Sequence, residues 1–141
     1  MKYKMQVLYS SKAGNTEKMA QAIGRAQKVK SDKIPPAYPV EGQKLILVGL
    51  ELGKGSADKQ VKDFISDLKP ERTKNVAFFV TGNVSGLDDL TSTLKGNGVN
   101  VLDDVYICEV KSGLFRSGKV TEEDIESVVK WADKIVNSLM D

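Results

Sequence analysis

The sequence predicts an α/β protein built on an open parallel sheet with helices on both faces. Two observations support this fold class. Apolar runs without alternation, at residues 45–50 and 76–80, are typical of strands covered on both faces. Segments with apolar residues at helical spacing follow these runs, so that strand and helix signals alternate along the chain.

The first strand is predicted to end at residues 7–9, in an apolar run. The helix after it has Met19, Ala20, Ile23 and Ala26 at helical spacing. A second strand is harder to place, because prolines interrupt the segment 29–40. Since proline cannot donate to a ladder, a strand there must be short and lie at an edge of the sheet.

Residues 45–50 and 76–80 are the third and fourth strands, and the helix between them runs along the apolar positions from Ala57 to Leu68. Leucines 87, 90 and 94 predict a short helix that ends at residues 96–98. A fifth strand is expected within 99–110, and Thr121 is placed to cap the last helix. The predicted core face of that helix consists of Ile125, Val128, Val129, Ala132, Ile135, Val136 and Leu139.

A loop of small and hydroxyl-bearing residues joins the first strand to the first helix. It consists of Ser10, Ser11, Lys12, Ala13, Gly14, Asn15 and Thr16. The first N–H groups of a helix lack internal partners and attract anions, so this loop is predicted to hold a phosphate. It lacks the Walker A and dinucleotide fingerprints, which favours a single phosphate monoester. The alternative is an ordinary turn in which Asn15 or Thr16 caps the helix.

With its ending Gly14-Asn15-Thr16, this loop resembles the phosphate loop of the flavodoxin family. The resemblance covers nearly the whole chain and implies one domain, residues 1–141. It implies a five-stranded parallel sheet in the flavodoxin-like order 2-1-3-4-5, with the proline-containing strand at the edge. It also implies FMN as the cofactor, bound at the carboxyl ends of strands one and three.

In flavodoxins the loops after the third and fourth strands hold the isoalloxazine ring. The residues that the resemblance assigns to the ring are Leu50, Glu51, Leu52, Gly53, Gly55, Thr81, Gly82 and Asn83. Neither loop contains an aromatic residue, although flavodoxins usually stack Trp or Tyr on the ring, so we expect weak FMN binding. Glu51 stands about where related proteins have an aromatic residue, and is expected either near the ring or directed to solvent.

Three functions are consistent with these features. The first is an FMN-binding redox protein that transfers electrons through the flavin. The second is a small FMN-dependent reductase or an accessory subunit of one, although no nicotinamide fingerprint is present. The third is a module with weak or lost flavin binding that holds a phosphate or a partner protein.

Composition limits the chemistry. With no histidine, the chain has no Ser-His or Cys-His nucleophile pair and no histidine-ligated metal, so no catalytic or metal-binding residue is predicted. The single cysteine, Cys108, lies in an apolar run and is expected to be buried. No apolar run spans a membrane and no signal peptide is evident, so a cytoplasmic monomer is expected. A net charge of +2 favours neither nucleic acid nor strong steering toward a redox partner, whose identity stays open.

Overall fold

The computed structural model describes residues 3–52, 57–82, 84–109, 112–113 and 116–140. Its centre is a parallel sheet in the order β2-β1-β3-β4, and β5 and β6 both pair with β4 at the far edge. The strands are β1 (Met5–Ser10), β2 (Ser31–Lys33), β3 (Gln43–Leu52), β4 (Thr73–Gly82), β5 (Asn100–Val101) and β6 (Tyr106–Cys108). The predicted order is confirmed, with the fifth strand divided into β5 and β6.

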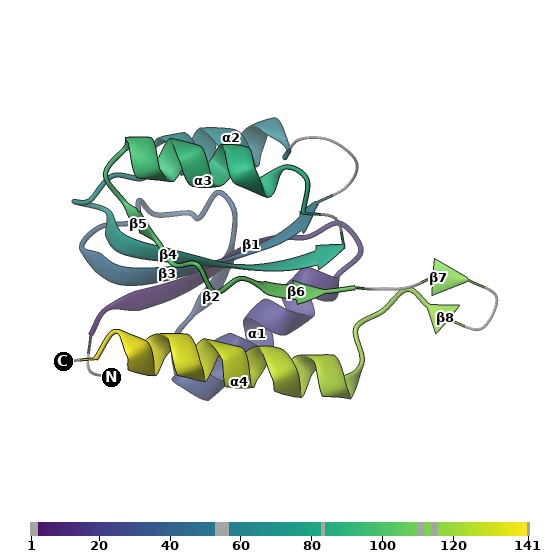
Figure 1. Ribbon diagram of the computed structural model, residues 1–141. Helices are drawn as coiled ribbons and strands as arrows, with labels where there is room; N and C mark the ends of the chain where they lie inside the picture. Colours follow the sequence, from purple (N-terminus) through teal and green to yellow (C-terminus); the bar gives the residue numbers. More distant parts are fainter. Residues whose placement is uncertain (1–2, 53–56, 83, 110–111, 114–115, 141) are drawn as a thin grey trace.

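Two helices cover each face of the sheet, as the sequence predicted. Figure 1 shows α2 (Lys59–Ser66) and α3 (Leu87–Gly96) on one face, and α1 (Asn15–Gln27) and α4 (Glu122–Ser138) on the other. The carboxyl ends of β4 and β6 point to the same end of the molecule, whereas the chain termini lie at the opposite end. The loops that follow the strands therefore gather at one edge.

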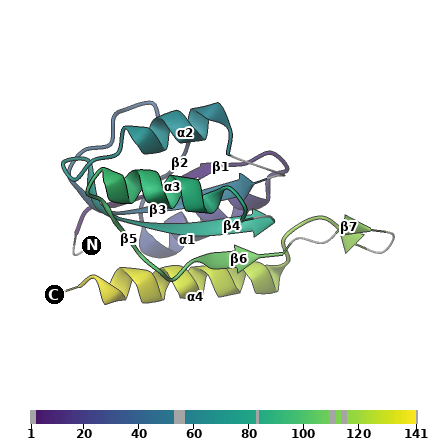
Figure 2. The same ribbon diagram turned by 45° about the horizontal axis from the view of Figure 1, so that its top comes forward.

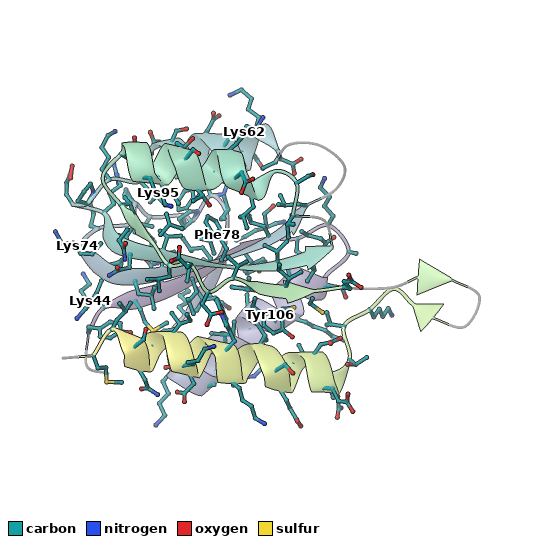
Figure 3. The ribbon with its side chains drawn as sticks, viewed as in Figure 1. Lys44, Lys62, Lys74, Phe78, Lys95 and Tyr106 are labelled. Carbon is teal, nitrogen blue, oxygen red and sulfur yellow. The ribbon has the colours of Figure 1, made fainter. Side chains whose placement is uncertain are left out.

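Each face of the sheet has its own hydrophobic cluster, because successive side chains of a strand point to opposite faces. In β3, Ile46 and Val48 belong to the cluster under α2 and α3, and Leu45 and Leu47 to the one under α1 and α4. Figure 3 shows Phe78 between the sheet and α3, and this side chain is fully buried. Burial on both faces explains why the sequences of these strands read as continuous apolar runs.

The structure differs from the sequence prediction in three places. Both β3 and β4 are longer than expected, so residues 51–52 and 81–82 belong to strands rather than to loops. Ala26 is exposed, because the buried residues of α1 lie between Asn15 and Gly24 and the last turn of the helix is not covered. The fifth strand breaks after Leu102, whose N–H still donates to the Val76 carbonyl (2.9 Å) before the chain turns toward β6.

A short antiparallel pair, β7 (Ser112–Gly113) and β8 (Arg116–Ser117), extends away from the sheet at its carboxyl edge (Figure 1). Figure 2 shows β7 beyond the carboxyl end of β6 in a second view. It lies between β6 and α4. Among the described residues, no helix combines the length and apolar composition that crossing a membrane requires.

Candidate functional site

The loop between β1 and α1 surrounds a single carboxylate, that of Glu51. The backbone N–H groups of Ala13 and Lys12 donate to its Oε2 atom, at 2.7 and 3.2 Å. The hydroxyls of Ser11 and Thr16 donate to its Oε1 atom, at 3.2 and 3.4 Å. Four donors from residues 11–16 thus converge on one negatively charged group, where the sequence predicts a phosphate.

The local sequence leaves these donors open. Gly14 precedes the helix with φ +90°, a conformation that glycine adopts without steric cost, and no side chain caps α1. The Gly14 N–H donates to Ser11 Oγ (3.1 Å), which holds the loop in a tight turn. The acceptor of the Lys12 and Ala13 amides is the Glu51 carboxylate, which belongs to β3 and not to the loop.

The sheet fixes the position of the Thr16 side chain. Its side chain is fully buried, and its hydroxyl lies 3.0 Å from the hydroxyl of Thr81, which is also buried. Gly49 makes room for this arrangement: a Cβ atom there would lie 2.7 Å from the Thr16 methyl group and 2.3 Å from the ring of Phe79. The hydroxyl of Thr16 is thus held in place by β3 and β4.

Strand alternation directs Glu51 toward the loop. Leu50 and Leu52 point into the core under α2 and α3, and are 0% and 7% exposed. The residue between them must therefore point to the other face, where α1 begins. Glu51 is thus directed to the loop rather than to solvent, and its position relative to a flavin ring stays a prediction. The contact depends on the pairing of β1 with β3, which places Ser10 beside Leu50 and which no local pattern reveals.

Other predicted phosphate-loop residues have different surroundings. The Asn15 side chain donates to the Gly118 carbonyl (3.0 Å) and accepts from the Val120 N–H (2.9 Å), so it ties the loop to the segment after β8. The Lys12 ammonium pairs with Asp58 (3.4 Å), a residue that sequence reasoning did not single out. Ser10 ends β1 and lines a cavity between the loop and β3.

That cavity has a volume of only about 10 Å³, about the size that holds one water molecule. Its walls are formed by Ser10, Lys12, Leu50, Glu51, Leu52, Ala57, Asp58 and Val61. The burial of Leu50 and Leu52 leaves little of either side chain to contact a flavin ring. The carboxylate of Glu51 forms part of the wall of this cavity.

The remaining ring residues are only partly described. Gly53, Gly55 and Asn83 lie outside the described residues, so the structure does not place them. Gly82 ends β4 with φ +86°. The single tryptophan, Trp131, lies far from these loops in the chain and packs on Phe79 and Tyr106, each with ring centroids 6.0 Å apart.

Cys108 is buried, as the sequence predicted. Burial, assisted by the nearby carboxylate of Asp124, raises the pKa of its thiol to about 11. A thiol with such a pKa is a poor nucleophile at neutral pH. Figure 3 shows the neighbouring side chain of Tyr106 directed toward α4, in the same cluster. Within the described part of the chain, no group of three His, Cys, Asp or Glu residues is arranged to hold a metal ion.

The sequence profile of the flavodoxin domain matches residues 6–137. The chain belongs to the flavodoxin family. A search of curated proteins found no matching relative.

Solved flavodoxins share the fold. Oxidised flavodoxin 1 from Bacillus cereus is 22% identical with a TM-score of 0.72, and the match covers 97% of this chain and 99% of that one. A flavodoxin from the domain Archaea is 20% identical with a TM-score of 0.75, covering 96% and 97%. Two-electron reduced Megasphaera elsdenii flavodoxin is 23% identical with a TM-score of 0.67, covering 92% and 98%.

Proposed function

We propose that this protein is an FMN-binding electron carrier. The observation that supports the proposal is the convergence of four donors from residues 11–16 on one anion, the Glu51 carboxylate. The oxygens of that carboxylate stand in for terminal oxygens of a phosphate monoester. Backbone N–H groups before a helix, supplemented by hydroxyls, are a common way to bind phosphate. The donor set therefore fits the phosphate of FMN.

The residues of the chain have separate tasks in this proposal. The amides of Lys12 and Ala13 and the hydroxyls of Ser11 and Thr16 hold the phosphate. Thr81 orients the hydroxyl of Thr16. The ring is expected against the loops that follow β3 and β4, including Gly53, Gly55 and Asn83. When bound, the flavin would supply the electron-transfer chemistry, which the side chains of this protein do not.

Partner recognition is expected to rely on contact rather than on long-range steering. The chain carries 21 basic and 19 acidic residues, so its field at a distance is small. We propose that the protein acts as a monomer in the cytoplasm and meets a redox partner protein through the carboxyl edge of the sheet, where the flavin would lie.

The test is titration of the purified protein with FMN, followed by flavin fluorescence and by the absorbance spectrum. We expect saturable quenching with one FMN per chain. Once reduced by dithionite, the complex should pass electrons to an external acceptor such as cytochrome c. Absence of binding at millimolar FMN would contradict the proposal, and NADH or NADPH oxidation by the complex alone would instead favour a reductase.

A second function is supported by a specific observation. The 10 Å³ cavity, together with a carboxylate already in the loop, is the arrangement expected of a flavodoxin-like module that has lost the flavin and binds a phosphate or a partner protein. Such a module would bind inorganic phosphate or a protein, but FMN no more tightly than phosphate. Comparing these two affinities distinguishes the candidates.

A further inference from the structure

We infer that the side chain of Glu51 is a built-in occupant of the phosphate loop, so that this carboxylate and the phosphate of a ligand exclude one another. The inference rests on the proposed function, because it concerns how the same site selects its ligand. It makes Glu51 the residue that determines the phosphate affinity of the loop.

The first support is that the carboxylate uses the donors that a phosphate needs. The backbone amides of Lys12 and Ala13 donate to its Oε2 atom, and the hydroxyls of Ser11 and Thr16 donate to Oε1. An N–H group with one hydrogen makes one good hydrogen bond at a time. A phosphate oxygen and Glu51 Oε2 therefore cannot both be bound by the Ala13 N–H.

The second support is that the carboxylate fits the loop imperfectly. The bond from Ala13 is short, at 2.7 Å, but the other three distances are 3.2–3.4 Å, long for bonds to a charged oxygen. A planar carboxylate has two oxygens, whereas a phosphate monoester presents three in a pyramid. The occupant can therefore be displaced by a ligand with a better arrangement of oxygens.

The third support is that Glu51 can move without loss of the fold. Its backbone is held in β3, opposite Thr81 in β4, and its neighbours Leu50 and Leu52 are anchored in the core. Its own side chain is only partly buried. A rotation about its side-chain bonds would clear the loop while the sheet stays unchanged.

The experiment compares the wild type with Glu51→Gln, which removes the charge, and Glu51→Ala, which removes the acceptor. Glu17→Gln is the matched control, because it removes one charge from the first turn of α1, where the carboxylate bonds Tyr9 rather than the loop. For each protein, FMN and riboflavin affinities are measured by fluorescence titration. Riboflavin lacks the phosphate, so the ratio of the two affinities isolates the phosphate contribution.

We expect the FMN-to-riboflavin affinity ratio to rise about 10- to 100-fold in the two Glu51 variants, the range for freeing donors held by a charged group. The ratio should stay within about twofold of wild type in Glu17→Gln, and riboflavin affinity should be similar in all four proteins. An equal ratio in wild type and both Glu51 variants would overturn the inference, because the carboxylate would then not compete with phosphate. A similar rise in Glu17→Gln would also overturn it, since the loss of any negative charge near the loop would then explain the change in the affinity ratio.

A separate titration with inorganic phosphate distinguishes this inference from the proposed function. It follows the backbone amide signals of Lys12 and Ala13 by ¹⁵N NMR. If neither flavin binds any variant, the electron-carrier proposal fails. The inference then stands if phosphate shifts these two amides in Glu51→Ala at concentrations that leave the wild type unchanged, and falls if it shifts them in neither or in both equally.

Discussion

The two helices on one face of the sheet begin in opposite ways. At α4, Thr121 accepts from the Asp124 N–H (3.1 Å) and Asp124 accepts from the Thr121 N–H (2.8 Å), a reciprocal capping box. At α1, Gly14 takes the cap position and no side chain caps the helix. The anion at that end comes from Glu51, which is 38 residues along the chain from Ala13.

We call the N-terminus of α4 the structural end, because side chains of the same helix stabilise it. We call the N-terminus of α1 the exchangeable end, because its anion comes from another element. At α4, three acidic residues in the first turn complement the helix dipole, and every one is covalently part of the helix it stabilises. At α1, the acceptor belongs to another element and can be replaced by a free anion. The α4 end should therefore affect stability alone, whereas the α1 end should affect both stability and phosphate binding.

The largest effect should follow Gly49→Ala, which disturbs the support under the α1 end. The added Cβ would lie 2.3 Å from the Phe79 ring and 2.7 Å from the Thr16 methyl group. Overpacking of this kind costs about 1–3 kcal/mol, and it should also displace the Thr16 hydroxyl. Urea unfolding and FMN titration measure the two effects.

Gly96→Ala is the control for that variant. Gly96 ends α3, and a Cβ there meets nothing within 4 Å. This change should leave stability the same or raise it by up to about 1 kcal/mol, as alanine favours helix over glycine. Equal destabilisation by the two substitutions would show that Gly49 is not the tight contact described above.

The next effect should come from Thr16→Val, which removes a hydroxyl from the exchangeable end. The buried hydroxyl of Thr81 would lose its partner, and the loop would lose one of its four donors. We expect FMN affinity to fall by about 1–3 kcal/mol, the range for a buried polar group left unpaired. Thr93→Val, at an exposed hydroxyl in α3, is the matched control and should leave FMN affinity unchanged. An equal FMN affinity in Thr16→Val and wild type would show that this hydroxyl does not contribute to phosphate binding.

This contrast also explains what could be predicted from the sequence. The four helices and the cap at Thr121 could be predicted, because apolar period and capping residues are local signals. The strand order could be predicted from the resemblance to the flavodoxin family. The position of Glu51 could not, because it depends on the register that sets Ser10 beside Leu50 and on the burial of the two flanking leucines. Likewise Asn15 reads as a helix cap, yet its side chain bonds a segment that is 103 residues away.

A smaller effect is expected at the structural end. Thr121→Ala removes the side-chain acceptor of the capping box and should cost about 1 kcal/mol in the free energy of unfolding. Thr121→Ser keeps a hydroxyl and should restore most of that loss. FMN affinity should be the same in all three proteins, because the Thr121 hydroxyl bonds Asp124 of its own helix and not the phosphate loop. A change in FMN affinity that follows the loss of stability would show that the two helix ends are coupled.

The last effect is absent at neutral pH and appears only at alkaline pH. It concerns Cys108, which faces the same end of α4. Burial, assisted by Asp124, raises the pKa of the thiol from 9.0 to about 11 in the folded protein. The folded state therefore holds this proton more tightly than the unfolded state does. The resulting stability is fully present below about pH 9 and is lost as the pH rises through about 11.

Cys108→Ala should make the free energy of unfolding fall less steeply between pH 9 and 11 than in wild type, as measured by urea denaturation at each pH. Tyr106 also has a pKa that burial and then the charge of Cys108 raise, so the difference between the two curves reports the thiol together with its coupling to Tyr106. Near pH 7 the thiol should react slowly with Ellman's reagent, with or without FMN, because no exchangeable ligand lies at this end. Parallel pH curves, together with rapid labelling at pH 7, would mean that the thiol is accessible and titrates normally, and that the α4 end is more open than its capping box indicates.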